Sequence, residues 1–152
     1  MTNQEIKTVL LTQSKAYIGE HRQRINKVLN NIKDSLFDEE KSTVGDKHHT
    51  NRAMLQLERE NLSQQLIEVE RQEAILNKIS IEHTTEIAHL GSLVITTGAT
   101  YFMSVSAGVV EIEKITYYCV SLESPIGKLL LGKKKGDSII FNDKEITIVE
   151  ID

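Results

Sequence analysis

Carboxylates gather between residues 34 and 46, and carboxylate oxygens are the protein ligands that Mg²⁺ and Ca²⁺ prefer. The candidates for contact with a cation or a basic partner are Asp38, Glu39, Glu40 and Asp46. An acidic run is usually a solvated loop. This run lies between two helical patterns, where a purely structural connection does not need carboxylates that repel one another. Its position therefore favours presentation to a partner or a cation.

Other residue types that carry chemistry give weaker patterns. His48 and His49 are adjacent, so on a helix their side chains would diverge by about 100°, and we interpret them as surface histidines. Cys119 is the only cysteine, and its apolar neighbours predict an inert, buried thiol. The sequence contains no Walker loop, dinucleotide fingerprint or zinc-type spacing. We therefore expect no active site and no cofactor of the chain's own.

Composition narrows the class of protein. The chain has 152 residues, of which 39% are hydrophobic and 26% are charged, and its net charge is -4. These values are typical of one globular domain or two small ones. No apolar run reaches the roughly 18 residues of a membrane span, and no signal-peptide pattern follows the start. With a single cysteine, these features predict a cytoplasmic protein that does not bind membranes.

Two helical patterns account for the first half of the chain. The apolar residues of the first pattern recur at three- and four-residue steps and predict one stripe on a long helix: Ile6, Val9, Leu10, Tyr17, Ile25, Val28, Leu29, Ile32 and Leu36. In the second pattern, Leu55, Leu62, Val69 and Leu76 fall seven apart. Two stripes with a short polar connection predict an antiparallel coiled-coil hairpin that closes within one chain, over residues 1–80 with its tip near 37–46. We expect a monomer.

Residues 81–152 change to a β-rich pattern. Short segments rich in β-branched and aromatic residues predict strands over 92–97, 101–106, 115–121, 138–141 and 145–151. Between the third and fourth segments, Ser124 can cap a short helix that begins at Pro125 and closes at Gly132. The predicted fold class is α+β: a long antiparallel helical hairpin, then a small antiparallel β-sheet domain with one short helix.

The charge and the aromatic residues of this second part argue against nucleic-acid binding. The segment is acidic overall and lacks a basic stripe, so we expect no sequence-specific DNA binding. Its aromatic side chains are interpreted as core and rim of the sheet: Tyr101, Phe102, Tyr117 and Tyr118. A small basic exception is the run from Lys133 to Lys135.

The order of these pieces resembles the bacterial Gre-type transcript cleavage factors over nearly the whole chain. The resemblance is carried by the string from Ser124 to Asp137, by Leu90-Gly91-Ser92-Leu93-Val94, and by His49 with Arg52 and Ala53 after the tip. It implies an FKBP-like fold for the β-rich domain and RNA polymerase as the partner.

The resemblance also implies how such a partner would be bound. In Gre factors the C-terminal domain docks at the rim of the polymerase secondary channel, and the hairpin reaches down that channel toward the active site. The polymerase-binding residues carried over to this chain are Ser124, Pro125, Ile126 and Gly127. Ile126 is expected to be an exposed apolar anchor.

Tip carboxylates of Gre factors help to hold a Mg²⁺ ion that is shared with RNA polymerase, and the polymerase performs the cleavage. Counting back from His49 and Arg52, the family's Asp and Glu fall at Lys41 and Val44, neither of which can ligate Mg²⁺. We therefore expect a regulator of elongation that is not itself an enzyme and stimulates little or no cleavage.

Two other functions stay open. The chain could be a coiled-coil interaction module without polymerase activity, which a pull-down of RNA polymerase would distinguish. A prolyl isomerase is the third interpretation, because an FKBP-like fold alone does not establish a catalytic pocket. A peptide isomerisation assay would address it.

Overall fold

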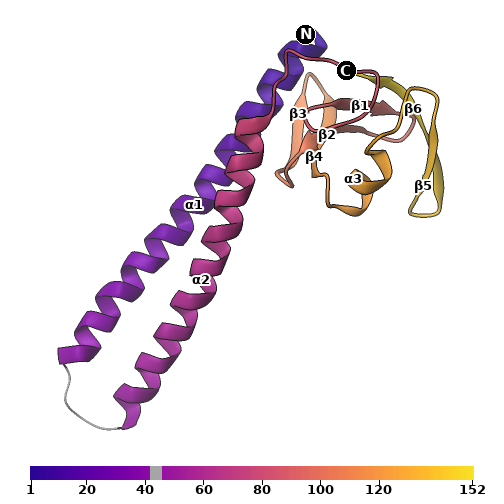
Figure 1. Cartoon of the computed structure of the whole chain (residues 1–152). Helices are drawn as coiled ribbons and strands as arrows, with labels where there is room; N and C mark the ends of the chain where they lie inside the picture. Colours follow the sequence, from indigo (N-terminus) through magenta and orange to yellow (C-terminus); the bar gives the residue numbers. More distant parts are fainter. Residues whose placement is uncertain (42–45) are drawn as a thin grey trace. The chain divides into compact units, whose positions relative to one another are not determined.

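The chain folds into two long helices followed by a β-rich region (Figure 1). The computed structural model describes residues 1–41 and 46–152, without the side chains of 41 and 46–48. The helices are α1 (Asn3–Lys41), α2 (Asp46–Lys78) and the short α3 (Pro125–Leu130). The strands are β1 (Leu93–Thr96), β2 (Thr100–Ser104), β3 (Gly108–Ile112), β4 (Ile115–Ser121), β5 (Ser138–Phe141) and β6 (Lys144–Ile151). The α+β class is thereby confirmed.

These elements form two compact units. One comprises residues 18–72, and the other comprises residues 1–17 together with 73–152. The first turns of α1 therefore share a unit with the sheet. The sequence divides the chain by element type at residue 80, and that division stays a prediction. No helix of the described part is both long and apolar enough to span a membrane.

Within residues 18–72, α1 and α2 run antiparallel in one register. Arg22 pairs with Glu70 at 3.7 Å, and Arg52 pairs with Glu40 at 3.1 Å. In both pairs the two residue numbers add up to 92, as a constant antiparallel register requires. The buried side chains of this unit are Ile18, Ile25, Ile32 and Leu36 on α1 and Val69 on α2. The predicted hairpin is confirmed for this part of the chain.

The predicted stripe on α1 was wrong at two positions. Tyr17 is 48% exposed and Val28 is 36% exposed. The buried positions Ile18, Ile25 and Ile32 fall seven apart, so the stripe follows a heptad seam. Tyr17 and Val28 lie beside that seam, and three- and four-residue steps alone do not separate the seam from its margin.

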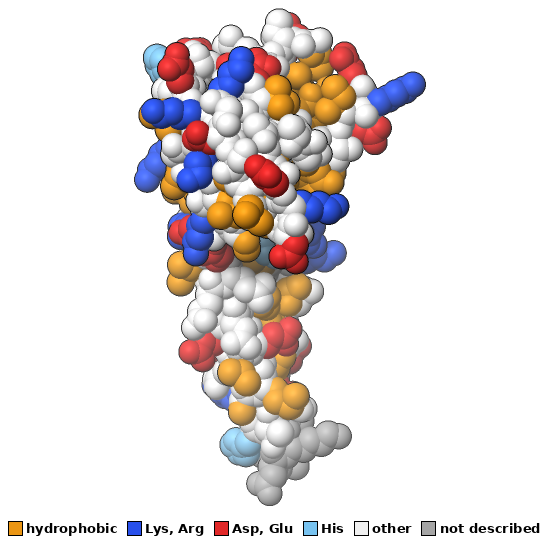
Figure 2. Space-filling model, turned by 90° about the vertical axis from the view of Figure 1, so that its right-hand side faces the viewer, with side chains coloured by type: hydrophobic (Ala, Val, Ile, Leu, Met, Phe, Trp, Pro, Cys, Tyr) orange, Lys and Arg blue, Asp and Glu red, His pale blue; other side chains and the backbone are white. Residues whose placement is uncertain are grey.

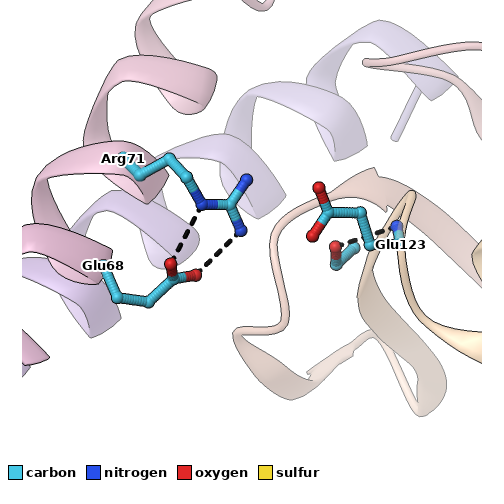
Figure 3. A network of polar contacts seen from close by, with 4 residues as sticks. Glu68, Arg71 and Glu123 are labelled. Atoms are coloured by element: carbon cyan, nitrogen blue, oxygen red, sulfur yellow. Dashed lines mark hydrogen bonds and ion pairs between the residues drawn. The ribbon is translucent and has the colours of Figure 1, made fainter.

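The outer surface of α2 carries a local ion pair. Arg71 donates from Nε to Oε2 of Glu68 at 3.0 Å and from Nη2 to Oε1 at 2.8 Å (Figure 3). These hydrogen bonds hold the pKa of Glu68 below its usual value. The pair joins neighbouring turns on a solvated face, so it organises the helix surface and adds little stability.

The register of the hairpin can be tested with spin labels at Asp34 and Glu58, whose numbers also add up to 92. In a Cys119→Ala background, labels on Asp34→Cys and Glu58→Cys should lie less than about 20 Å apart, because packed helix axes are separated by roughly 10 Å. Pulsed electron resonance measures this distance. An excess of unlabelled chain should leave it unchanged; loss of the short distance on such dilution would place the pairing between chains.

The sheet has the order β3-β4-β2-β1-β6-β5. All neighbours are antiparallel except β2 and β4, which are parallel. The prediction of an all-antiparallel sheet was wrong at this pair. β3 follows β2 in the sequence and forms an antiparallel hairpin with β4, so β4 runs in the same direction as β2. β3 itself was not predicted. Its turn uses Glu113 (φ 50°) and Lys114 (φ 68°), residue types that do not mark a tight turn as Gly or Asn would.

Each face of the sheet has its own core. One face packs with α3 around Ala88, Val94, Tyr101, Met103, Ile126, Leu130, Ile139, Ile146 and Ile148. On the other face, Phe102, Tyr117 and Cys119 are also buried. Burial raises the pKa of the Cys119 thiol, and the neighbouring Ser14 hydroxyl on α1 opposes that change. The predicted buried thiol is thereby confirmed.

The start of α1 brings a lysine into this second core. Lys7 is 1% exposed. Burial lowers the pKa of its ammonium group, and the charge of Asp152 acts in the opposite direction. Two further polar contacts hold the same end of the helix: the amino group of Met1 lies 3.8 Å from Glu113, and Asn3 donates to Glu150 at 3.4 Å. The first turns of α1 are therefore an integral layer of the β-rich unit.

Replacing Lys7 tests whether this buried charge stabilises the fold. A lysine whose pKa is lowered releases its proton from the folded protein first, so its contribution makes the free energy of unfolding rise with pH up to the ordinary value of 10.5. Lys7→Met should abolish that rise and change stability by less than about 2 kcal/mol. Urea unfolding at a series of pH values measures both. The exposed Lys15→Met is the control. A loss of several kcal/mol in Lys7→Met would show instead that the ammonium group is net stabilising.

Candidate functional site

The acidic end of α1 is one of two candidate sites. Asp38 and Glu40 are exposed, and Glu39 is half-buried. Arg52 Nη2 donates to Glu40 Oε1 at 3.1 Å, so the Glu40 carboxylate is already paired. Consecutive helical positions diverge by about 100°, so the three side chains do not converge. The side chains of Lys41 and Asp46, and all of Val44, lie outside the described part of the chain.

No cluster of His, Cys, Asp or Glu that could hold a metal ion exists among the described residues. The predicted acids of α1 are therefore placed near one another in the chain without being brought together as ligands.

Two grooves flank the same end of the hairpin and differ in charge. One encloses about 600 Å³ and includes Glu39, Glu58, Met54 and Leu57 in its lining. The other encloses about 400 Å³ and is lined by Lys33, Leu36, Phe37, Glu40, Arg52, Gln56 and Arg59. Sequence reasoning missed this gathering of three cations. The helix register would have indicated it, because the numbers of Lys33 and Arg59 add up to 92, as in the two ion pairs. That register is known only from the structure.

The second candidate site is the loop and helix from Ser124 to Gly132. Ser124 is the N-cap of α3, and its hydroxyl accepts a hydrogen bond from the Gly127 amide at 3.1 Å. Pro125 follows at the first helical position, and Gly132 (φ +81°) lies just beyond the end. The predicted capped helix is confirmed. Just before this cap in the sequence, the Glu123 amide donates to the Ser121 hydroxyl at 3.1 Å (Figure 3).

Ile126 does not have the exposure that was predicted for it. Its side chain is 6% exposed and belongs to the core beneath α3. Ile126 and Leu130 are four residues apart, so they lie on one face of the helix and both turn toward the sheet. The prediction of an exposed apolar anchor at Ile126 was wrong. Of the four carried-over docking residues, Pro125 is exposed and Ser124 is half-buried.

Gly127 has a steric role in this site. A Cβ atom at position 127 would overlap the carbonyl oxygen of Ser121. That oxygen also accepts a hydrogen bond from the Ser124 hydroxyl at 2.6 Å and from the Ser124 amide at 3.1 Å. The absence of a side chain at Gly127 is what lets α3 approach the end of β4.

Gly127→Ala should therefore destabilise the protein by about 1–3 kcal/mol, as overpacking against backbone does. Gly98→Ala is the matched control. Its Cβ would meet Ile146 at an ordinary 3.5 Å, so stability should be unchanged or raised by less than about 1 kcal/mol. Thermal and urea unfolding measure the two variants. Equal stability of Gly127→Ala and the wild type would show that the loop after β4 moves freely away from α3.

A third polar cluster lies where the chain enters β1. The Ser92 hydroxyl lies 2.8 Å from Nδ1 of His89, and the His89 amide donates to that hydroxyl at 3.0 Å. Gly91 (φ +91°) makes the intervening turn. Ser92 is completely buried, so it cannot reach a substrate as a nucleophile. The cluster braces the turn within the Leu90–Val94 string.

Comparisons with known proteins give a similarity at the level of structure. No protein-family model matches the chain, and no protein with a curated description is similar to it. Among solved structures, it is similar to the crystal structure of GreA factor homolog 1 (Gfh1) of Thermus thermophilus. That similarity covers 98% of this chain and 94% of the other, with 20% identity and a TM-score of 0.34.

Proposed function

We propose that this protein binds RNA polymerase and regulates transcription elongation by placing its helical hairpin in the secondary channel. The observation that carries the proposal is the antiparallel hairpin of 18–72, in which α1 brings Asp38, Glu39 and Glu40 to the end next to the connection. The partner comes from the resemblance of the sequence strings to Gre factors. The proposed protein is a cytoplasmic monomer, and the catalytic Mg²⁺ would belong to the polymerase.

The dimensions of the hairpin suit insertion into a channel. At 1.5 Å per residue, the 33 residues of α2 extend over roughly 50 Å. A pair of packed helices presents a narrow cross-section, and the ion pairs Arg22–Glu70 and Arg52–Glu40 show that the two helices stay in one register along it. Such an arm carries a charged end far from its attachment, which is the requirement for reaching a recessed active site.

The charges at this end favour regulation without cleavage. Glu40 would have to leave Arg52 in order to bind a cation. Asp38 and Glu39 point away from one another on the helix, and the family's metal-binding positions are occupied by Lys41 and Val44. A lysine near a metal site repels the incoming ion. The proposed effect is therefore altered pausing or inhibition.

Cleavage of backtracked RNA by polymerase saturated with this protein tests the proposal. The unmodified protein should bind the polymerase and change pausing while stimulating little cleavage. Lys41→Asp with Val44→Glu should raise the cleavage rate about tenfold or more, as a restored metal ligand set would. The matched control is Lys27→Asp with Val28→Glu, which makes the same exchanges away from the end of the hairpin and should change nothing.

Two outcomes would contradict parts of this proposal. Strong cleavage by the unmodified protein, abolished by Asp38→Ala or Glu39→Ala, would show that the displaced carboxylates act as ligands. Absence of binding to RNA polymerase would favour the coiled-coil interaction module, for which the two grooves at the end of the hairpin offer surfaces of opposite charge.

A further inference from the structure

Most lysines of the β-rich part occupy one short segment. Residues 81–152 contain six lysines and ten acids, and four of the six lysines are Lys128, Lys133, Lys134 and Lys135. The other 81–152 lysines are Lys114 and Lys144. The segment from 128 to 137 is therefore positive within a region that is otherwise strongly acidic. Neither the fold of α3 nor the proposed role of the hairpin accounts for this concentration.

The fold brings these lysines together with two exposed apolar side chains. Lys128 lies in the last turn of α3, and Leu131 follows as its C-cap, 45% exposed. Beyond Gly132 the chain runs antiparallel to residues 87 and 88: the Ala88 amide donates to Lys133 O at 2.9 Å, and the Gly132 amide donates to Ala88 O at 2.9 Å.

This pairing continues as a bridge between Ile87 and Lys134, and the Ile87 side chain is 44% exposed. We call the exposed group of Ile87, Lys128, Leu131, Lys134 and Lys135 the lysine surface. Figure 2 shows one face of the molecule, on which hydrophobic side chains lie at the surface among Lys and Arg side chains.

A purely structural explanation covers only part of the lysine surface. A cation near a helix C-terminus is favourable, but α3 has six residues and Lys128 alone supplies that charge. The nearest acids in sequence are Glu86, Glu123 and Asp137, and Asp137 already accepts a hydrogen bond from the Lys134 amide at 2.8 Å. Helix capping also gives no reason for the exposure of Leu131 and Ile87 next to these lysines.

We propose that the lysine surface docks an acidic segment of a partner protein, one in which Asp or Glu residues flank an apolar side chain. Carboxylates would pair with Lys128, Lys134 and Lys135, and the apolar residue would cover Leu131 and Ile87. A protein is favoured over nucleic acid because the surface contains no arginine and no aromatic side chain for base stacking, and because apolar residues gain nothing from phosphates. Assigning this acidic segment to RNA polymerase rests on the proposed function. The preference of the lysine surface for an acidic segment does not rest on it.

A direct binding measurement tests the surface with the full chain. The probe is a fluorescent 15-residue peptide in which Asp and Glu flank a central Leu pair, and the comparison peptide has Lys in place of each acid. Lys128→Glu with Lys135→Glu should weaken binding of the acidic peptide at least tenfold and reduce its salt dependence. Lys114→Glu with Lys144→Glu changes the charge equally elsewhere in the same unit and should change binding less than twofold.

Two further variants separate recognition from damage to the fold. The Glu-substituted protein should bind the Lys peptide better than the wild type does, which a misfolded surface would not. Leu131→Ser should weaken binding of the acidic peptide several-fold. Ile115→Ser, at a site 52% exposed outside the lysine surface, should leave that binding unchanged. Anisotropy titrations measure all combinations.

The outcomes distinguish this inference from the proposed function. Equal binding of both peptides by the wild type, or tighter binding of a single-stranded RNA or of anionic vesicles than of the acidic peptide, would overturn the docking surface. Peptide binding that depends on the lysines supports it, whether or not polymerase binds. If the peptide binds and purified RNA polymerase does not, the lysine surface stands and the polymerase proposal fails. If polymerase binds equally to both Lys→Glu variants, the segment does not belong to polymerase.

Discussion

The antiparallel pairing of α1 and α2 is the constraint on which the rest of the hairpin depends. Each helix carries a narrow apolar seam, with Ile18, Ile25 and Ile32 on one side and Val69 on the other. An isolated helix would leave this seam exposed to water. Because helices in proteins are stabilised mainly by packing of their apolar faces, each helix depends on the other. The pairing therefore forms the helices and sets their register at the same time.

That register distributes charge as well as apolar area. It brings Arg52 to Glu40 and gathers Lys33, Arg52 and Arg59 in one groove, while Glu39 and Glu58 line the other. The end of the hairpin is thus not uniformly acidic, as the run of carboxylates alone would indicate. One groove at this end is cationic and includes Phe37, and the other is acidic and includes Met54 and Leu57.

In the β-rich unit, the Ser121 carbonyl organises the junction between β4 and α3. It accepts hydrogen bonds from the Ser124 amide and hydroxyl, and it lies where a side chain at Gly127 would be. Three residues of the segment from Ser124 to Gly132 consequently have structural roles: Ser124 in the cap, Ile126 in the core and Gly127 in the close approach. The side chains that the junction leaves exposed in this segment are Pro125, Lys128 and Leu131.

Local features of the sequence determined much of this protein. Apolar residues at three- and four-residue steps predicted the first helix, and a seven-residue spacing predicted the second and its pairing with the first. Ser124, Pro125 and Gly132 specified the ends of α3, because caps are interactions between near neighbours in the chain. Short segments rich in β-branched and aromatic residues specified most of the strands. The α+β class and the acidic end of the hairpin followed from these patterns.

Tertiary structure decided the features that join distant residues. The burial of Ile126 depends on which face of α3 meets the sheet, and the burial of Lys7 depends on the first turns of α1 covering the other face. The parallel pairing of β2 with β4 and the cationic groove depend on strand order and helix register. None of these leaves a periodic trace in the sequence, because each is set by packing between elements far apart along the chain.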